Sequence, residues 1–292
     1  MIDILTSAAV LLRIISNPLG NVFQKQLTQQ DHHPLFVNFF TYFSLSVLCL
    51  LVIPLLHWPA LPLSFWIYSI MGGITGALGN GFLVKALQKG DLSVLGPVNA
   101  YKSVVSMIIG LFLLHEIPGT WGLVGVALII YGSYYVLDAP EQRFGWAILK
   151  RPEIRFRIWA MILTAIEAVL VKKVILASSP LLAFMGWCWF GTLFSFLLLF
   201  FNGLQAGTEI RKLSFANIRT FVLLVICIGT MQLTTNRAFS HMPVAYALSL
   251  FQLSTLVSVL LGYRIFRERN IRRKLIGSLI MLAGSVIIIL LP

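Results

Sequence analysis

Three fully charged side chains lie near the middle of long apolar stretches of this 292-residue chain. They are Arg13, Lys102 and Glu167. A charge at the centre of a membrane-spanning helix costs about 2.5 to 3.5 kcal/mol on insertion scales, so such residues usually face an aqueous cavity or one another. A buried ion pair between Glu167 and one of the two bases would explain part of the pattern. One positive charge would still remain, which favours a ligand that carries a carboxylate or a phosphate.

The stretch from 96 to 103, Gly-Pro-Val-Asn-Ala-Tyr-Lys-Ser, concentrates groups that could bind such a ligand. Pro97 lacks a backbone donor and frees the carbonyl of Ser93, which a membrane tolerates only where protein or water replaces the donor. Asn99 and Lys102 are three residues apart and therefore share a helix face, beside Tyr101. We expect this face to form a wall of the binding site. The alternative is that Pro97 only bends the helix and Asn99 only joins neighbouring helices.

Amide and phenol groups in other apolar stretches could complete the same site. They could bind a cargo, or they could form helix-to-helix hydrogen bonds worth roughly 0.6 to 2 kcal/mol. These candidates are Asn17, Asn80, Gln232, Asn236, Tyr246 and Gln252. We expect no metal and no cofactor, because the three cysteines lie in separate apolar stretches and the five histidines lack ligand spacing. Trp187 and Trp189 are expected to face lipid, although they could instead line a pocket for an apolar cargo.

The elements that must position these side chains follow from the composition. The chain is 58% hydrophobic and only 11% charged, whereas a soluble domain is about 25% charged. Long charge-free runs supply the roughly 20 apolar residues that a membrane-spanning helix needs. We therefore predict an all-α integral membrane protein with ten transmembrane helices, near 3–26, 35–56, 64–86, 92–114, 119–137, 156–177, 181–201, 218–239, 244–265 and 272–290.

An internal repeat divides these helices into two groups. Residues 86–136 match residues 238–288 without a gap at a constant offset of 152, and the identical pairs include Glu116 with Glu268, Gly125 with Gly277 and Gly132 with Gly284. We predict two inverted five-helix repeats at 1–138 and 156–292, joined by a linker at 139–155. Two similar bundles of opposite orientation can exchange shapes, which gives inward-open and outward-open states.

The net charge of +12 is distributed unevenly among the loops. Seventeen of the 22 Lys and Arg residues follow the first, third, fifth, seventh and ninth predicted helices, and only three follow the even-numbered ones. This is the pattern of the positive-inside rule, so we expect the odd-numbered loops in the cytoplasm and both termini outside. The basic charge thus reflects topology and does not indicate a nucleic-acid partner.

The repeated block resembles the EamA repeat of the drug/metabolite transporter superfamily, because a Glu follows the fourth helix of each half and glycines come nine and sixteen residues later. Two features differ: His115 and Arg267 precede these Glu residues where the family often has Gly, and the family's ten-helix members are commonly drawn with both termini inside. The resemblance implies a secondary transporter in the cell (inner) membrane. Its partners would be the lipid bilayer and a small metabolite, such as an exported amino acid or related carboxylate.

Other functions are left open by the residues. The cargo could be a phosphorylated sugar or a nucleotide-type compound, and protons could be coupled only through Glu167. The chain could also be a non-transporting assembly protein, as a monomer or a homodimer. A membrane enzyme is disfavoured, because no loop offers a Ser/His/Asp set or clustered carboxylates.

Overall fold

The computed structural model describes residues 4–55, 60–101, 105, 119–137, 150–242 and 244–290. Within these ranges the chain is helical apart from short connections and contains no strand, which confirms the all-helical class. The helices are α1 (Ile4–Gln29), α2 (Pro34–Val52), α3 (Leu63–Lys89), α4 (Leu92–Leu95), α6 (Thr120–Leu137), α8 (Pro152–Ala177), α9 (Pro180–Phe201), α10 (Ala206–Arg211), α11 (Phe215–His241), α12 (Val244–Phe251), α13 (Ser254–Phe266) and α14 (Ile271–Leu290), with 3₁₀ turns η1 (Ile53–Leu55) and η2 (Pro97–Ala100).

Four of the described helices are long and apolar enough to cross a membrane by composition alone: α2, α3, α9 and α11. α1 and α8 have 26 residues each and are also long enough, but polar side chains interrupt their apolar surfaces. Large apolar side chains point away from the bundle, with Leu51 70% and Phe201 78% exposed, as expected for a surface in contact with lipid. The total of ten spans stays a prediction, because most of 102–118 lies outside the described ranges.

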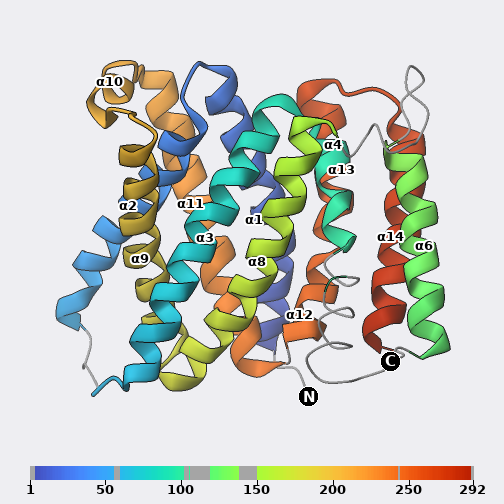
Figure 1. The fold of residues 1–292 in the computed structure, drawn as a ribbon, viewed down its shortest axis with the longest axis horizontal. Coiled ribbons are helices and arrows are strands. Elements are labelled where there is room, and N and C mark those ends of the chain that lie inside the picture. Colours follow the sequence, from blue (N-terminus) through green and yellow to red (C-terminus); the bar gives the residue numbers. More distant parts are fainter. Residues whose placement is uncertain are drawn as a thin grey trace.

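The two halves of the chain pack through reciprocal helix pairs. α1 packs on α11 and α3 packs on α8, so the first helix of each half contacts the third helix of the other. The halves run in opposite directions: Glu153, at the start of α8, lies beside Gly90, whose carbonyl accepts a hydrogen bond from Lys25 near the end of α1. Figure 1 shows the start of α1 and the end of α14 at one end of the bundle and α10 at the other.

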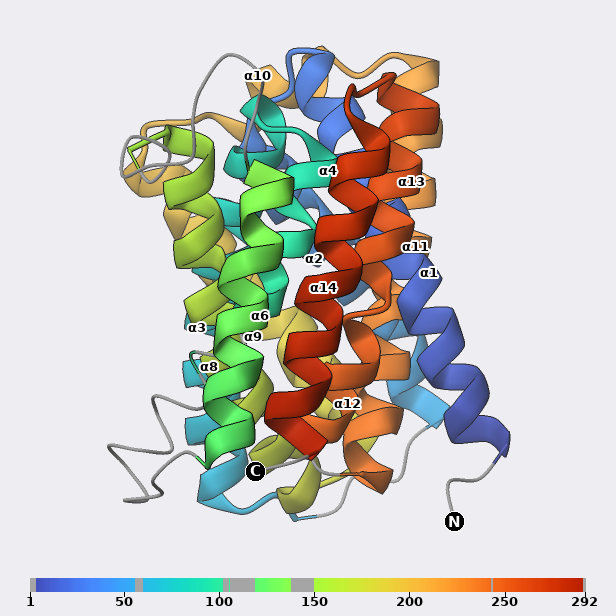
Figure 2. The same cartoon turned by 90° about the vertical axis from the view of Figure 1, so that its right-hand side faces the viewer.

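α6 and α14 lie side by side (Figure 2). At the repeated glycines the backbones of the two helices are in direct contact. A Cβ atom at Gly277 would lie 2.6 Å from the carbonyl oxygen of Gly132, and one at Gly284 would lie 2.6 Å from that of Gly125. No real side chain tolerates such distances, so glycine is required at both positions. The matched glycines of the repeat therefore form the close packing surface between these two helices.

The fourth helix of each half is broken, whereas the sequence predicted continuous helices near 92–114 and 244–265. In the first half α4 ends at Leu95 and η2 begins at Pro97, whose ring prevents a regular turn. In the second half α12 and α13 are separated at Gln252, without a proline. The amide of Gln252 donates to the backbone carbonyl of Asn99 over 3.1 Å. A hydrogen bond thus joins the two breaks.

Candidate functional site

A cavity of about 100 Å³ lies where the two broken helices meet α1, α3, α8, α9 and α11. Both halves of the chain contribute to it. Six of the eleven candidate side chains from the sequence line this cavity: Arg13, Asn17, Asn80, Asn99, Glu167 and Gln232. The structure therefore brings together residues that are up to about 220 positions apart in the chain.

Arg13 is held at one wall of the cavity by two contacts. Its Nε donates to Oγ1 of Thr235 over 2.8 Å, and its guanidinium carbon lies 4.8 Å from the centre of the Phe251 ring. Its Nη1 is buried and has no hydrogen-bond partner among the described residues. A buried donor without an acceptor costs about 1 to 3 kcal/mol, and more when it is charged. An anion that entered the cavity would remove this cost.

Glu167 projects into the cavity from α8 and is only 8% exposed. The indole Nε1 of Trp187 donates to its Oε1 over 2.6 Å. Gly76 on α3 leaves room for the carboxylate, since a Cβ atom there would collide with Oε1. Trp187 is buried and lines the cavity, so the expectation that it faces lipid was wrong. The indole ring supplies a donor to the one acidic group among the cavity-lining residues.

Arg157 is a cavity residue that the sequence analysis counted only among the basic residues after the fifth predicted helix. It lies in the second turn of α8, is 4% exposed and lines the cavity. Its Nε donates over 2.7 Å to the carbonyl oxygen of Leu95, the last residue of α4 before the break. The broken helix thus gains a donor from α8. In the sequence, Pro97 indicated that the carbonyl of Ser93 needs a donor from elsewhere in the protein, but it pointed neither to Leu95 nor to Arg157.

The remaining candidates occupy other positions. Asn236 lies one turn from Gln232 and accepts a hydrogen bond from it over 3.0 Å, while its own amide donates to Pro180. Gln252 is bonded to Asn99 behind the cavity wall. Tyr101 packs against the apolar cluster between α6 and α14. Lys102 and the side chain of Tyr246 lie outside the described residues.

A layer of apolar side chains closes the cavity toward the end of the bundle where α1 finishes. It contains Val22, Leu92, Leu95 and Ile154, each at most 2% exposed. Val22 follows the cavity residue Asn21 on α1, and Ile154 precedes the cavity residue Arg157 on α8, which runs in the opposite direction. Among the described residues, this packed layer therefore separates the cavity from the carboxyl end of α1.

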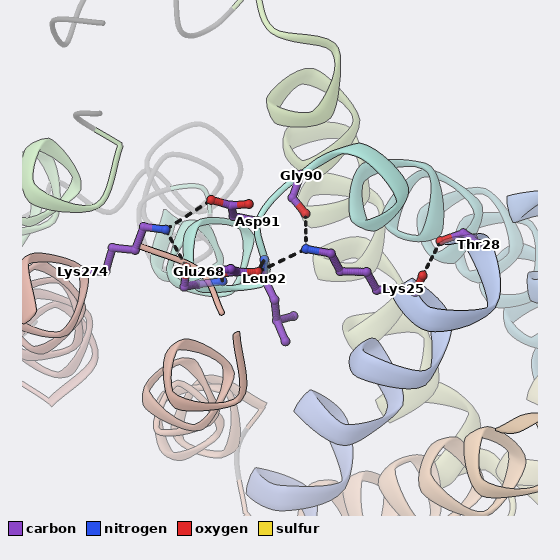
Figure 3. Close-up of polar contacts among 8 residues, drawn as sticks. Lys25, Thr28, Gly90, Asp91, Leu92, Glu268 and Lys274 are labelled. Carbon is purple, nitrogen blue, oxygen red and sulfur yellow. Dashed lines mark hydrogen bonds and ion pairs between the residues drawn. The ribbon is translucent and has the colours of Figure 1, made fainter. Parts of the chain in front are cut away.

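A charged network covers the outer side of this apolar layer (Figure 3). Lys25 forms a 3.1 Å ion pair with Glu268, and their side chains are only 6% and 4% exposed. Glu268 also accepts hydrogen bonds from the backbone N–H groups of Leu92 and Ser93, over 2.8 and 2.9 Å. Lys274 reaches the same place from α14 and donates to the hydroxyl of Ser93 over 2.7 Å. This network joins α1, α4, α13 and α14.

Apolar helices in two inverted halves, with charged and amide groups gathered between them, define a membrane transporter of small molecules. The chain belongs to the EamA-like transporter family, whose model matches residues 8–137 and 153–290. These two matches confirm the resemblance of each half to the EamA repeat. No curated protein matches the chain.

The fold also occurs in a solved structure. A protein known from a crystal structure superposes with a TM-score of 0.65 at 14% sequence identity, over 98% of this chain and 97% of the other. At this level of identity the likeness concerns the fold alone. It extends over nearly the whole length of both chains.

Proposed function

We propose that this protein is a secondary transporter that exports an amino acid or a related carboxylate compound across the inner (plasma) membrane by alternating access. The observation that carries the proposal is the buried Nη1 of Arg13, which has no hydrogen-bond partner among the described residues, in a cavity between the two halves. A carboxylate accepts hydrogen bonds from guanidinium groups in a favourable planar geometry. The described residues that line the cavity include two guanidinium groups and one carboxylate, and this balance favours an anionic or zwitterionic cargo.

The cargo would contact groups at two levels of the cavity. Arg157 and Glu167 are ten residues apart on α8, which corresponds to roughly 15 Å along the helix. Arg13 would bind the carboxylate of the cargo, Glu167 would balance a cationic group such as an amine, and Arg157 would bind the anion as it enters from the end near Lys25. The amides of Asn17, Asn80, Asn99 and Gln232 would complete the hydrogen bonds.

Alternating access is supported by the inverted arrangement of the halves and by closure at one end. The apolar layer and the charged network obstruct the end near Lys25. Exchange of the two halves' conformations would open this end and close the other. By the charge distribution this end would be cytoplasmic, and both termini would lie outside.

Two further candidates rest on specific features. The two arginines that line the cavity, Arg13 and Arg157, would also suit a cargo with phosphate groups, such as a phosphorylated sugar or a nucleotide-type compound. A non-transporting assembly protein would have no use for a buried arginine nitrogen without an acceptor among the described residues, so we rank it lower. Proton coupling, if it occurs, would run through Glu167.

Transport by reconstituted protein tests this proposal. Proteoliposomes would be loaded with a mixture of amino acids, organic acids, sugar phosphates and nucleotides. The compounds they release would be measured by mass spectrometry and compared with those from protein-free liposomes loaded with the same mixture. We expect release of one class of carboxylate compound, and loss of that release in Arg157→Gln. Arg155→Gln is the matched control, because Arg155 is exposed on the same helix. Absence of release for every compound, with correctly folded protein, would contradict the proposal.

A further inference from the structure

We propose that the ion pair between Lys25 and Glu268 is a latch that holds one end of the transport path closed and breaks once in every cycle. This inference rests on the proposed transport function, and it assigns gating to residues outside the cavity. The pair joins the two halves of the chain: Lys25 belongs to α1 and Glu268 follows α13. Movement of one half relative to the other at this end must therefore separate the two charges.

The position of the pair suits a gate. From the cavity outward, α1 presents Asn21 to the cavity, Val22 to the apolar layer and Lys25 to Glu268. α4 repeats this order in the opposite chain direction, since the carbonyl of Leu95 binds the cavity residue Arg157 while the N–H of Leu92 binds Glu268. Cargo that enters from this end has to pass both layers. The ion pair is the outer of the two.

The opposite end of the bundle carries a lysine in a comparable position. Lys172 lies near the carboxyl end of α8, as Lys25 does in α1. Lys25 donates to the carbonyl of Gly90 just after α3, and Lys172 donates to the carbonyl of Phe239 and, over 3.5 Å, to that of Met242 just after α11. Gly90 and Met242 correspond at the offset of 152 in the repeat. Glu116, which matches Glu268 in the repeat, lies outside the described residues. Among the described residues the lysine–carboxylate pair is therefore a feature of the Lys25 end.

Lys25 retains one hydrogen bond when the latch opens. The carbonyl of Gly90, which accepts from its Nζ, belongs to the same half of the chain. Glu268 would lose the N–H groups of Leu92 and Ser93 together with Lys25, because α4 belongs to the first half. Separation of a buried ion pair is costly when it leaves one charge alone. Opening therefore requires water or other donors to replace the lost partners of Glu268.

Chemical labelling of a cysteine in the cavity tests the latch without knowledge of the cargo. Thr164 lines the cavity and would be changed to cysteine in a background where Cys49, Cys188 and Cys227 are replaced by alanine. A membrane-impermeant maleimide would then be applied to membrane vesicles of each orientation. We expect Lys25→Met to raise the labelling rate from the Lys25 end by about tenfold, which corresponds to a loss of roughly 1.4 kcal/mol of closed-state stability.

Lys172→Met is the matched control, because it removes a lysine in a comparable position at the opposite end of the bundle; we expect no change in labelling from the Lys25 end. Glu268→Gln provides a second variant of the latch, and its expected effect is in the same direction. An unchanged rate in folded Lys25→Met, or an equal increase from both ends, would overturn the proposal. Labelling does not require transport, so failure of the latch is distinguishable from failure of the proposed function.

Discussion

Replacement of Arg13 by methionine should separate the roles of this side chain in stability and in binding. Methionine keeps much of the length and removes the charge. The change would lose the bond from Nε to Thr235, worth about 1.5 to 3 kcal/mol for a charged donor, and the contact with Phe251, worth about 0.5 to 2 kcal/mol. It would also remove the desolvation cost of a buried cation, which is several kcal/mol in real proteins. Thr235 retains its own bond to the carbonyl of Met231 over 2.7 Å.

These opposing contributions are of similar size, so we expect the stability of the ligand-free protein to change by no more than about 1 to 2 kcal/mol. Binding of an anion should respond differently. Each charged hydrogen bond lost from the cargo is worth about 1.5 to 3 kcal/mol, which corresponds to a roughly 10- to 150-fold weaker affinity. Arg13 would thus matter little for folding and greatly for the cargo.

Thermal unfolding of the purified protein in detergent measures both quantities. Glutamate and inorganic phosphate serve as probe anions, because binding to the folded state raises the melting temperature by an amount that increases with the logarithm of the ratio of anion concentration to dissociation constant. Arg155→Met, at an exposed position on α8, is the control for loss of a positive charge. Destabilisation by about 3 to 5 kcal/mol, with the anion-induced shift retained, would show that Arg13 serves as a buried structural charge and would refute the reasoning.

Four further results are expected. Glu167→Gln should abolish any dependence of transport on pH, and an unaltered pH profile would exclude proton coupling through this residue. Gly277→Leu should lower the free energy of unfolding by about 1 to 3 kcal/mol by forcing α6 away from α14. Gly207→Ala should leave it unchanged, because a Cβ atom there would meet no other atom within 4 Å; thermal unfolding of both variants measures the difference. Burial raises the pKa of Glu209, but hydrogen bonds from Lys212 and from the N–H of His33 outweigh burial and hold that pKa below its usual value. The ionised carboxylate therefore stabilises the fold at neutral pH, and this contribution is lost as the pH falls through the lowered pKa. Glu209→Gln should accordingly flatten the acid side of a plot of melting temperature against pH. A reporter enzyme active only in the cytoplasm should give no signal at the carboxyl terminus, and strong activity would reverse the orientation.

The membrane class and the reciprocal halves could be inferred from sequence because both depend on patterns extending over many residues. Apolar runs of about 20 residues have few alternatives to helix in a bilayer. Glycine occurs at 132, 277 and 284 because backbone contact between α6 and α14 admits no larger residue there. Arg13 and Glu167 were recognised because the cost of a charge at that depth does not depend on its neighbours.

Features set by tertiary contacts were not predictable. Arg157 lies among charged residues near the start of α8, and nothing local distinguishes it from the exposed Arg155. Trp187 lies in a long apolar stretch, so the sequence favours contact with lipid. Its place at the cavity follows from its hydrogen bond to Glu167 on another helix, which the sequence does not show. The break between α12 and α13 has no proline to mark it. The left-handed backbone at Arg267, with φ 53°, explains why the family often has glycine before this Glu, but the residue present here gives no such signal.

The pairing of α1 with α11 has a consequence for biosynthesis. Arg13 is made and inserted 222 residues before Thr235, so its helix must enter the bilayer while its eventual partner has not yet been synthesised. During that interval the cation has neither acceptor nor cavity, and the nascent chain carries the full insertion cost of about 2.5 to 3.5 kcal/mol. Termination of translation before α11 would leave α1 in this unsupported condition, which makes the early chain a substrate for quality-control proteolysis.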